Sequence, residues 1–164
     1  MDLYEKGIAV NSLSKTYSIP GIRVGWVASN TEVADILRDY RDYTMICAGV
    51  FDDMVATLVL ENKEAILKRN RQIVEENLAL MDAWIAKEPK ASWVRPASVS
   101  TSFVKLDVNR PIEDFALELL QEYGVLVVPG NRFDKESHVR IGYCCDKEVL
   151  QKGLEKLSQF LNKC

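Results

Sequence analysis

The sequence predicts an α/β fold, and three observations in its 164 residues support that prediction. Short apolar runs at 8–11 and 23–28 are typical of buried strands. Residues 63–86 contain no proline or glycine and carry an apolar stripe at helical spacing, which predicts one helix of about 36 Å. After Pro89 the pattern becomes strand, strand, helix, strand, strand, helix, which is typical of a compact α/β subdomain.

The first region, 1–62, contains the two strands and two predicted helices. Ser29-Asn30-Thr31-Glu32 supplies polar capping residues, and the apolar spacing that follows predicts a helix over 31–46. Ala48-Gly49 interrupts that pattern, and a second helix is expected over 51–60. A parallel sheet needs several strands and crossover helices to cover both of its faces. We therefore expect this region to be a truncated part of a larger domain.

The long helix leads from the first region to a second one. We expect a bridging helix at 63–88, ended by Lys87-Glu88-Pro89, and a small α/β domain at 89–164. In that domain Gly124 is placed to end a helix over 112–123, and Asp146 is placed to begin the last helix. Strands are expected at 91–95, 102–107, 125–128 and 138–143.

Composition excludes several classes of protein. Apolar residues make up 48% of the chain, which is a globular composition, and a net charge of −3 gives no electrostatic footprint for nucleic acid. No apolar run approaches the length of a membrane span, and no charged-then-apolar leader begins the chain, so a cytoplasmic protein is expected. The four cysteines are expected to be reduced thiols, and one histidine does not predict a zinc site.

The polar segment between the first two strands carries the candidate chemistry. It contains Ser12-x-x-Lys15 and, eight residues after the lysine, Arg23-x-Gly25. A lysine on a loop can act as an amine nucleophile, while an arginine and hydroxyl groups are the donors that a phosphate needs. The alternative is a hairpin or crossover loop whose Lys15 and Arg23 are simply solvated.

The pattern resembles the active-site lysine segment of the class I/II (fold type I) pyridoxal-phosphate-dependent aminotransferases. A second block, Val127-Val128-Pro129-Gly130-x-x-Phe133 followed by Val139-Arg140-Ile141-Gly142-Tyr143, is similar to another signature region of that family. The two blocks have the family's order, so the resemblance covers nearly the whole chain. It implies that 1–62 is the end of the large cofactor domain and that 89–164 is the small C-terminal domain.

The resemblance also implies roles for four residues. Lys15 would form the Schiff base with pyridoxal 5'-phosphate and act as general acid and base. Ser12 and Arg23 would bind the phosphate of the cofactor, with Ser12 favoured over Ser14 by spacing, and Arg140 would hold the α-carboxylate of the substrate. The alternatives are a surface lysine for Lys15, loop-backbone capping for Ser12, a structural salt bridge for Arg23, and an ordinary, partly exposed strand arginine for Arg140. No metal ligand is expected.

The implied reaction is transfer of an amino group from an amino acid to a 2-oxo acid. In the family, the aspartate that pairs with the pyridine nitrogen precedes the lysine segment, and nothing here matches it, so the fragment alone is expected to be inactive. A β-lyase or decarboxylase of the same fold, and a non-catalytic α/β interaction module, remain as alternatives. Uncovered apolar surfaces predict a homo-oligomer. His138, Tyr17, Trp26 and Phe103 are interpreted as structural residues.

Overall fold

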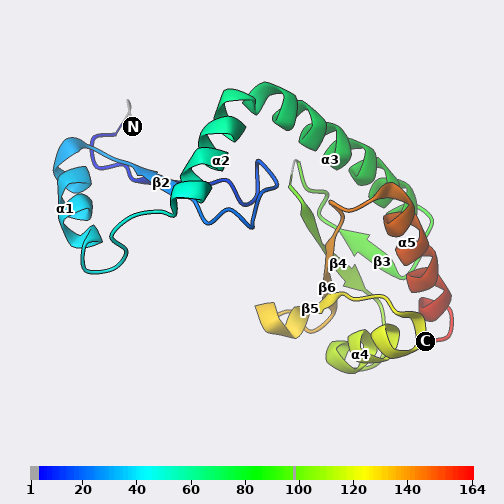
Figure 1. Cartoon of the computed structure of the whole chain (residues 1–164). Coiled ribbons are helices and arrows are strands. Elements are labelled where there is room, and N and C mark those ends of the chain that lie inside the picture. The colour runs from blue at the N-terminus through cyan, green and yellow to red at the C-terminus, as the bar shows by residue number, and fades with distance from the viewer. Residues whose placement is uncertain (1–3, 98) are drawn as a thin grey trace. The chain divides into compact units, whose positions relative to one another are not determined.

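The computed structural model describes residues 4–97 and 99–164. The chain divides into two compact units, a first unit of Met1–Asn70 and a second unit of Arg71–Cys164 (Figure 1). The described residues form five α-helices and two small sheets, which confirms the predicted α/β class. The finer division at 62 and 88 stays a prediction, and residues 1–3 of the predicted first region lie outside the described residues.

The first unit contains a two-stranded antiparallel sheet. Strand β1 (Ala9–Ser12) pairs with β2 (Gly25–Ala28), with Ala9 opposite Ala28 and Ser12 opposite Gly25. Both predicted strands are therefore confirmed. The prediction that they are buried is wrong for this chain, since all eight positions are exposed and Val10 is 74% exposed. The reason is that, within the described part of the first unit, no other strand or helix covers these residues.

Two helices follow the sheet in the first unit. Helix α1 (Thr31–Arg41) begins where it was predicted, because the Asn30 side chain accepts a hydrogen bond from the amide of Val33 at 2.9 Å. It ends five residues before the predicted end at 46. The amides of Tyr43 and Thr44 donate to the carbonyls three residues earlier, those of Tyr40 at 3.1 Å and Arg41 at 3.0 Å, and turns replace the helix there. Helix α2 (Val50–Glu61) confirms the second prediction.

The core of the first unit is small. Among the described residues, the buried side chains of this cluster are Leu13, Ala56 and Val59. Partly buried side chains surround them: Tyr17, Ile19, Ile22, Val24 and Ile66. This packing places the segment that joins β1 to β2 against α2.

Helix α3 (Lys63–Ile85) is a single 23-residue helix, close to the prediction. Its later turns belong to the second unit, where Leu78 and Met81 enter the core. The buried side chain of Asn77 donates hydrogen bonds to the carbonyls of Tyr143 at 2.7 Å and Cys145 at 2.9 Å. No helix in the described part of the chain is long and apolar enough to cross a membrane.

The second unit is built on a four-stranded antiparallel sheet (Figure 1). Its spatial order is β3 (Ala91–Trp93), β4 (Thr101–Leu106), β6 (His138–Gly142) and β5 (Val128–Pro129). The helices α4 (Ile112–Tyr123) and α5 (Lys147–Leu161) contribute Phe115, Leu119, Leu157 and Phe160 to the same core as Val104 and Val139 of the sheet. The sheet therefore has one face on the core and one face away from it.

The end of α4 and the beginning of α5 agree with the residues predicted for them. Gly124 adopts the left-handed conformation, with φ of 67°, and the side chain of Asp146 accepts from the amide of Glu148 at 2.9 Å. Of the strand predicted at 125–128, only Val128 joins the sheet, because the amide of Val125 bonds back to Leu119. The segment that follows β5 forms a 3₁₀ helix, η1 (Gly130–Phe133). All four cysteines are free, as predicted.

Candidate cofactor and carboxylate sites

The lysine loop, defined as residues 13–24, is held by its own backbone and by one buried side chain. The amide of Leu13 donates to the carbonyl of Val24 at 3.2 Å, and the amide of Ile19 donates to the carbonyl of Leu13 at 3.1 Å. The Leu13 side chain is fully buried. Because both ends of the loop are bonded to each other, the residues between them are confined to a small region.

Lys15 lies at a tight turn within this loop. The amide of Ser18 donates to the carbonyl of Lys15 at 3.0 Å, and Ser18 has a φ of 57°, a left-handed conformation that few residues other than glycine adopt. The side chain of Asn70 donates to the carbonyl of Thr16 at 2.9 Å. The turn fixes the backbone on both sides of Lys15 while its side chain remains exposed. Backbone strain of this kind is common at functional sites.

Arg23 and two serines meet beside the lysine. The guanidinium of Arg23 donates to the Pro20 carbonyl at 2.6 Å and reaches the hydroxyl of Ser14 at 3.5 Å. The hydroxyl of Ser12 accepts from the amide of Ser14 at 3.3 Å. The Arg23 guanidinium is therefore within reach of the Ser14 hydroxyl, and the Ser12 hydroxyl is bonded to the backbone of the same serine. This donor set fits an anion such as a phosphate.

The contacts of Gly25 explain why the Arg-x-Gly pattern needs a glycine at its last position. A Cβ atom built at this position would lie 2.6 Å from the carbonyl oxygen of Asn11. A side chain would push β2 away from β1, and Arg23 and Ser12 stand at the adjoining ends of these strands. The glycine is thus required by packing, and it keeps the two halves of the pattern together.

Ser14 is the residue that sequence reasoning passed over. Spacing alone favoured Ser12, and the hydroxyl within reach of Arg23 in this structure is that of Ser14. The signal was present in the sequence, because Ser14 directly precedes the lysine. Both hydroxyls now belong to the candidate anion site.

Arg140 lies in the second unit, on β6. It stands opposite Phe103 of β4 and Val128 of β5 and is exposed. Its guanidinium carbon is 5.3 Å from the centre of the Phe133 ring. Among the described residues its guanidinium makes no ion pair or hydrogen bond, so its donors are available to a carboxylate.

His138 stands two residues before Arg140 on the same face of β6. Its ring stacks on Phe103, with centres 4.8 Å apart and planes 18° apart. Burial lowers the pKa of His138 below its ordinary value of 6.5, and the nearby cations Lys135 and Lys105 lower it further. At neutral pH this ring is therefore an uncharged packing group.

The two signature blocks match an established family. The family model described as aminotransferase class I and II matches residues 1–157. The chain belongs to the class I and II aminotransferases. The family predicted from the lysine and arginine patterns is thereby confirmed.

Individual aminotransferases of known structure align over almost the whole chain. A PLP-dependent aminotransferase from Streptococcus suis is 67% identical with a TM-score of 0.96, covering 99% of this chain and 43% of that one. An aspartate aminotransferase from Thermotoga maritima is 27% identical with a TM-score of 0.82, covering 94% of this chain and 40% of that one. Because the Streptococcus suis protein is PLP-dependent, the expected cofactor of this aminotransferase chain is confirmed at the level of the family.

The curated relatives are similar in coverage. Capreomycidine synthase of Streptomyces vinaceus is 28% identical over 158 residues, covering 96% of this chain and 41% of the relative. A probable N-acetyl-LL-diaminopimelate aminotransferase of Bacillus subtilis is 26% identical, covering 98% of this chain and 42% of the relative. The chain thus spans about two fifths of the length of these relatives.

Proposed function

We propose that this chain is the C-terminal part of a pyridoxal-phosphate-dependent aminotransferase that transfers an amino group from an amino acid to a 2-oxo acid. The observation that carries the proposal is the lysine loop, where Lys15 stands in the same short segment as an anion site made of one guanidinium and two hydroxyls. A cofactor that combines an aldehyde with a phosphate requires both kinds of group close together.

The residues of the loop have separate roles in this proposal. When bound, pyridoxal phosphate supplies the aldehyde that carries the amino group and the ring that withdraws electrons from the substrate. Arg23, with Ser12 and Ser14, binds the phosphate by charge-assisted hydrogen bonds. Lys15 holds the aldehyde end and moves the proton at the α-carbon of the substrate. The packing of Leu13 fixes the loop that carries Lys15, Arg23 and Ser14, and Ser12 directly precedes that loop at the end of β1.

Arg140 is proposed to bind the α-carboxylate of the amino acid. A planar guanidinium with free donors matches a carboxylate in two parallel hydrogen bonds. Its exposure supports this role, and so does the absence of an ion pair or hydrogen bond to its guanidinium among the described residues. Binding the carboxylate orients the α-carbon for proton transfer.

Cofactor capture tests the proposed role of Lys15. Pyridoxal phosphate is added to the chain and to the complete enzyme that carries it, and the visible absorbance of the cofactor is followed. Lys15→Ala should abolish the lysine-dependent change in the complete enzyme, while Lys6→Ala, another exposed lysine of the first unit, should leave it intact. Equal absorbance changes in both variants would overturn the proposal.

The 164 residues alone are proposed to have little or no activity. The resemblance assigns the partner of the pyridine nitrogen to a segment that precedes the lysine in the family, and without that partner the ring withdraws electrons poorly. Steady transamination by the purified chain would contradict this part of the proposal.

Assays of the complete enzyme separate transamination from its alternatives. Formation of glutamate from 2-oxoglutarate supports an aminotransferase. Release of pyruvate with ammonia indicates a β-lyase, and release of CO₂ indicates a decarboxylase. An Arg140→Ala enzyme that binds its amino acid unchanged would favour a non-catalytic interaction module.

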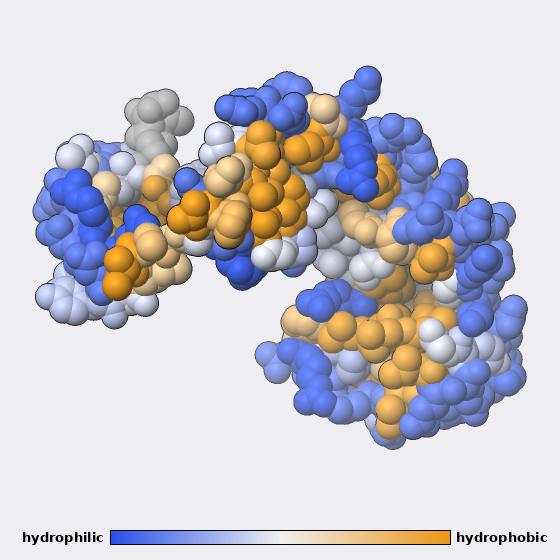
Figure 2. Space-filling view, viewed as in Figure 1, coloured by the Kyte–Doolittle hydropathy of each residue, from blue (hydrophilic) through white to orange (hydrophobic). Residues whose placement is uncertain are grey.

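Self-association is proposed from the apolar surface of the first unit. Hydrophobic side chains gather over α2 (Figure 2), where Val50 is 73% and Phe51 is 84% exposed. Exposed apolar area of this kind usually marks a protein interface. Light scattering of the purified chain should show an oligomer, and Phe51→Glu should reduce its mass. A monodisperse wild-type monomer would refute a homo-oligomer.

A further inference from the structure

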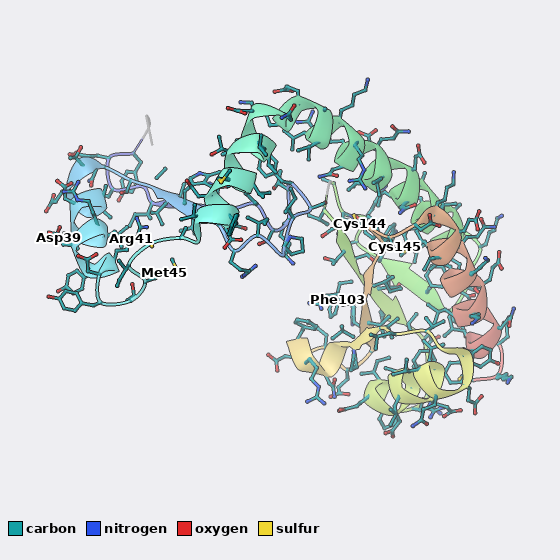
Figure 3. The ribbon with its side chains drawn as sticks, viewed as in Figure 1. Asp39, Arg41, Met45, Phe103, Cys144 and Cys145 are labelled. Atoms are coloured by element: carbon teal, nitrogen blue, oxygen red, sulfur yellow. The ribbon has the colours of Figure 1, made fainter. Side chains whose placement is uncertain are left out.

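The outward face of the second unit's sheet gathers aromatic and basic side chains around Arg140. Residues alternate along a strand, so the buried Val104 and Val139 place Phe103 and Arg140 on the side away from the core. The register puts Phe103 opposite Arg140 and Lys105 opposite His138. Phe103 is labelled on β4 in Figure 3.

Phe133 reaches this face from the end of η1, outside the sheet. Its ring meets Phe103 edge-on with centres 5.8 Å apart, and the guanidinium carbon of Arg140 lies 5.3 Å from its centre. A guanidinium over an aromatic ring is attracted by the electrons of the ring face. Phe103 in turn stacks on the uncharged ring of His138. The three rings and the arginine form one continuous cluster.

The loop that carries Phe133 is held in place at several points. The amide of Lys135 donates to the carbonyl of Gly130 at 3.0 Å, and a Cβ atom at Gly130 would lie 2.2 Å from the Lys135 carbonyl oxygen. Arg132 forms an ion pair with Glu113 of α4, and the side chain of Asn131 donates to the same carboxylate at 2.7 Å. Although Phe133 is 45% exposed, its backbone is therefore tied to the sheet and to α4.

A long arginine side chain without a partner samples many rotamers, and binding a ligand must then restrict them. A fixed aromatic surface beneath the guanidinium removes part of that cost, because the planar group is already aligned before the ligand arrives. The central carbon of the guanidinium lies over the ring, and the group's donors stay available to a ligand.

We propose that Phe133 is the positioning residue of Arg140, and that its ring, braced at the edge by Phe103, holds the guanidinium ready for the carboxylate of the amino-acid substrate. The inference rests on the proposed function of Arg140 and adds the group through which that residue is aligned. Phe133 itself makes no bond to the substrate. Its contribution is to affinity for the carboxylate and not to the proton transfer.

The test uses the complete holoenzyme that carries this sequence. Phe133→Leu keeps an apolar side chain and removes the aromatic face, so the KM for the amino-acid donor should rise about two- to fivefold while kcat changes little. The Kd of the unreactive α-methyl analogue of the donor, measured by cofactor absorbance, should rise by the same factor. Phe133→Tyr keeps the aromatic face, so its KM and Kd should stay close to those of the wild-type enzyme. Leu117→Ala, which removes an exposed apolar side chain of α4, is the matched control.

Arg140→Lys separates this inference from the proposed function beneath it. Loss of the bidentate contact should raise the KM for the donor about 10- to 100-fold. If Arg140→Lys changes nothing, the proposed function of Arg140 fails. If Arg140→Lys raises KM while Phe133→Leu does not, the positioning role alone is overturned.

The double variant distinguishes positioning from general structural support. In an Arg140→Lys background, Phe133→Leu should add little, because its effect passes through the guanidinium. If the effects of Arg140→Lys and Phe133→Leu on KM are fully additive, the inference is overturned. It is also overturned if Phe133→Tyr loses affinity for the donor as Phe133→Leu does. If Phe133→Leu does not fold, as judged by circular dichroism, Phe133→Met takes its place with the same expected rise in KM and Kd.

Discussion

The two units of this chain differ in how far they bury their own apolar side chains. In the described part of the second unit, seventeen buried side chains form one core, and all but Val127 and Tyr143 come from α3, the sheet, α4 and α5. In the described part of the first unit, the buried cluster has three members, and Val10 and Phe51 are 74% and 84% exposed. The difference indicates that the second unit carries most of its own stability, while the first unit leaves large apolar side chains uncovered.

This contrast bears on function, because the proposed catalytic lysine lies in the less stabilised unit. Lys15 and its anion site stand on a loop that one buried leucine attaches to α2. Arg140 stands on a strand in the middle of a four-stranded sheet. We therefore expect the lysine loop to be more sensitive to what covers the first unit than the carboxylate site is to its own surroundings.

The largest expected effect tests the core of the second unit. Phe115→Ala removes a fully buried ring that packs 4.9 Å from the ring of Phe160, centre to centre. The free energy of unfolding should fall by about 3–5 kcal/mol, measured by chemical denaturation followed by circular dichroism. Leu117→Ala, on the exposed side of the same helix, should stay within about 0.5 kcal/mol. Similar losses from both variants would contradict a well-packed second unit.

The next effect tests the first unit. Leu13→Ala removes a fully buried side chain, but its few buried neighbours should limit the loss to about 2 kcal/mol, at the low end for such changes. Amide hydrogen exchange should increase across 13–24, because that side chain attaches the lysine loop to α2. Val10→Ala, at an exposed strand position, is the control. Unchanged exchange in the loop of the Leu13 variant would refute this attachment.

A smaller effect compares two glycines of the second unit. A Cβ atom added at either position would have no neighbouring atom within 4 Å, but Gly124 has a φ of 67° and Gly153 lies inside α5. Gly124→Ala should destabilise by about 1 kcal/mol, because alanine is strained in the left-handed conformation. Gly153→Ala should stabilise by about 0.5–1 kcal/mol, because alanine is the better helix former. Thermal denaturation measures the change in stability of both variants. If both changes have the same sign, the assignment of Gly124 to the end of α4 is contradicted.

The smallest effect is the pH dependence of the second unit. The pKa of His138 is lowered in the folded state by burial and by Lys135 and Lys105, so the unfolded state binds more protons in this range. The stabilisation is present above the ordinary pKa of 6.5 and is lost as the pH falls through the lower folded value. Denaturation midpoints should therefore decrease between about pH 7.5 and about pH 5. His138→Phe should remove the part of this decrease that comes from the histidine. If the midpoint of the variant falls with pH as steeply as that of the wild type, the role of His138 is contradicted.

Local signals predicted most of the helices and the family. Asn30, Gly124 and Asp146 act within one turn of chain, so their effects are readable from neighbouring residues. The strand at 125–128 was overestimated because apolar residues also follow a helix end, where the backbone of Val125 turns back to Leu119. The end of α1 was missed because the sequence pattern does not show that the amides of Tyr43 and Thr44 bond to carbonyls three residues earlier.

The sequence by itself determined the spacing of Ser12, Lys15, Arg23 and Gly25, and with it the family, because these residues lie in one short segment. Only the tertiary structure decided that Ser14 faces Arg23, that Gly25 must be small against Asn11, and that Phe133 lies under Arg140. Those facts depend on loop conformation and on the approach of segments that periodicity does not specify. The burial predicted for β1 and β2 failed for a related reason. Burial depends on which surfaces meet, and not on the apolar character of a strand alone.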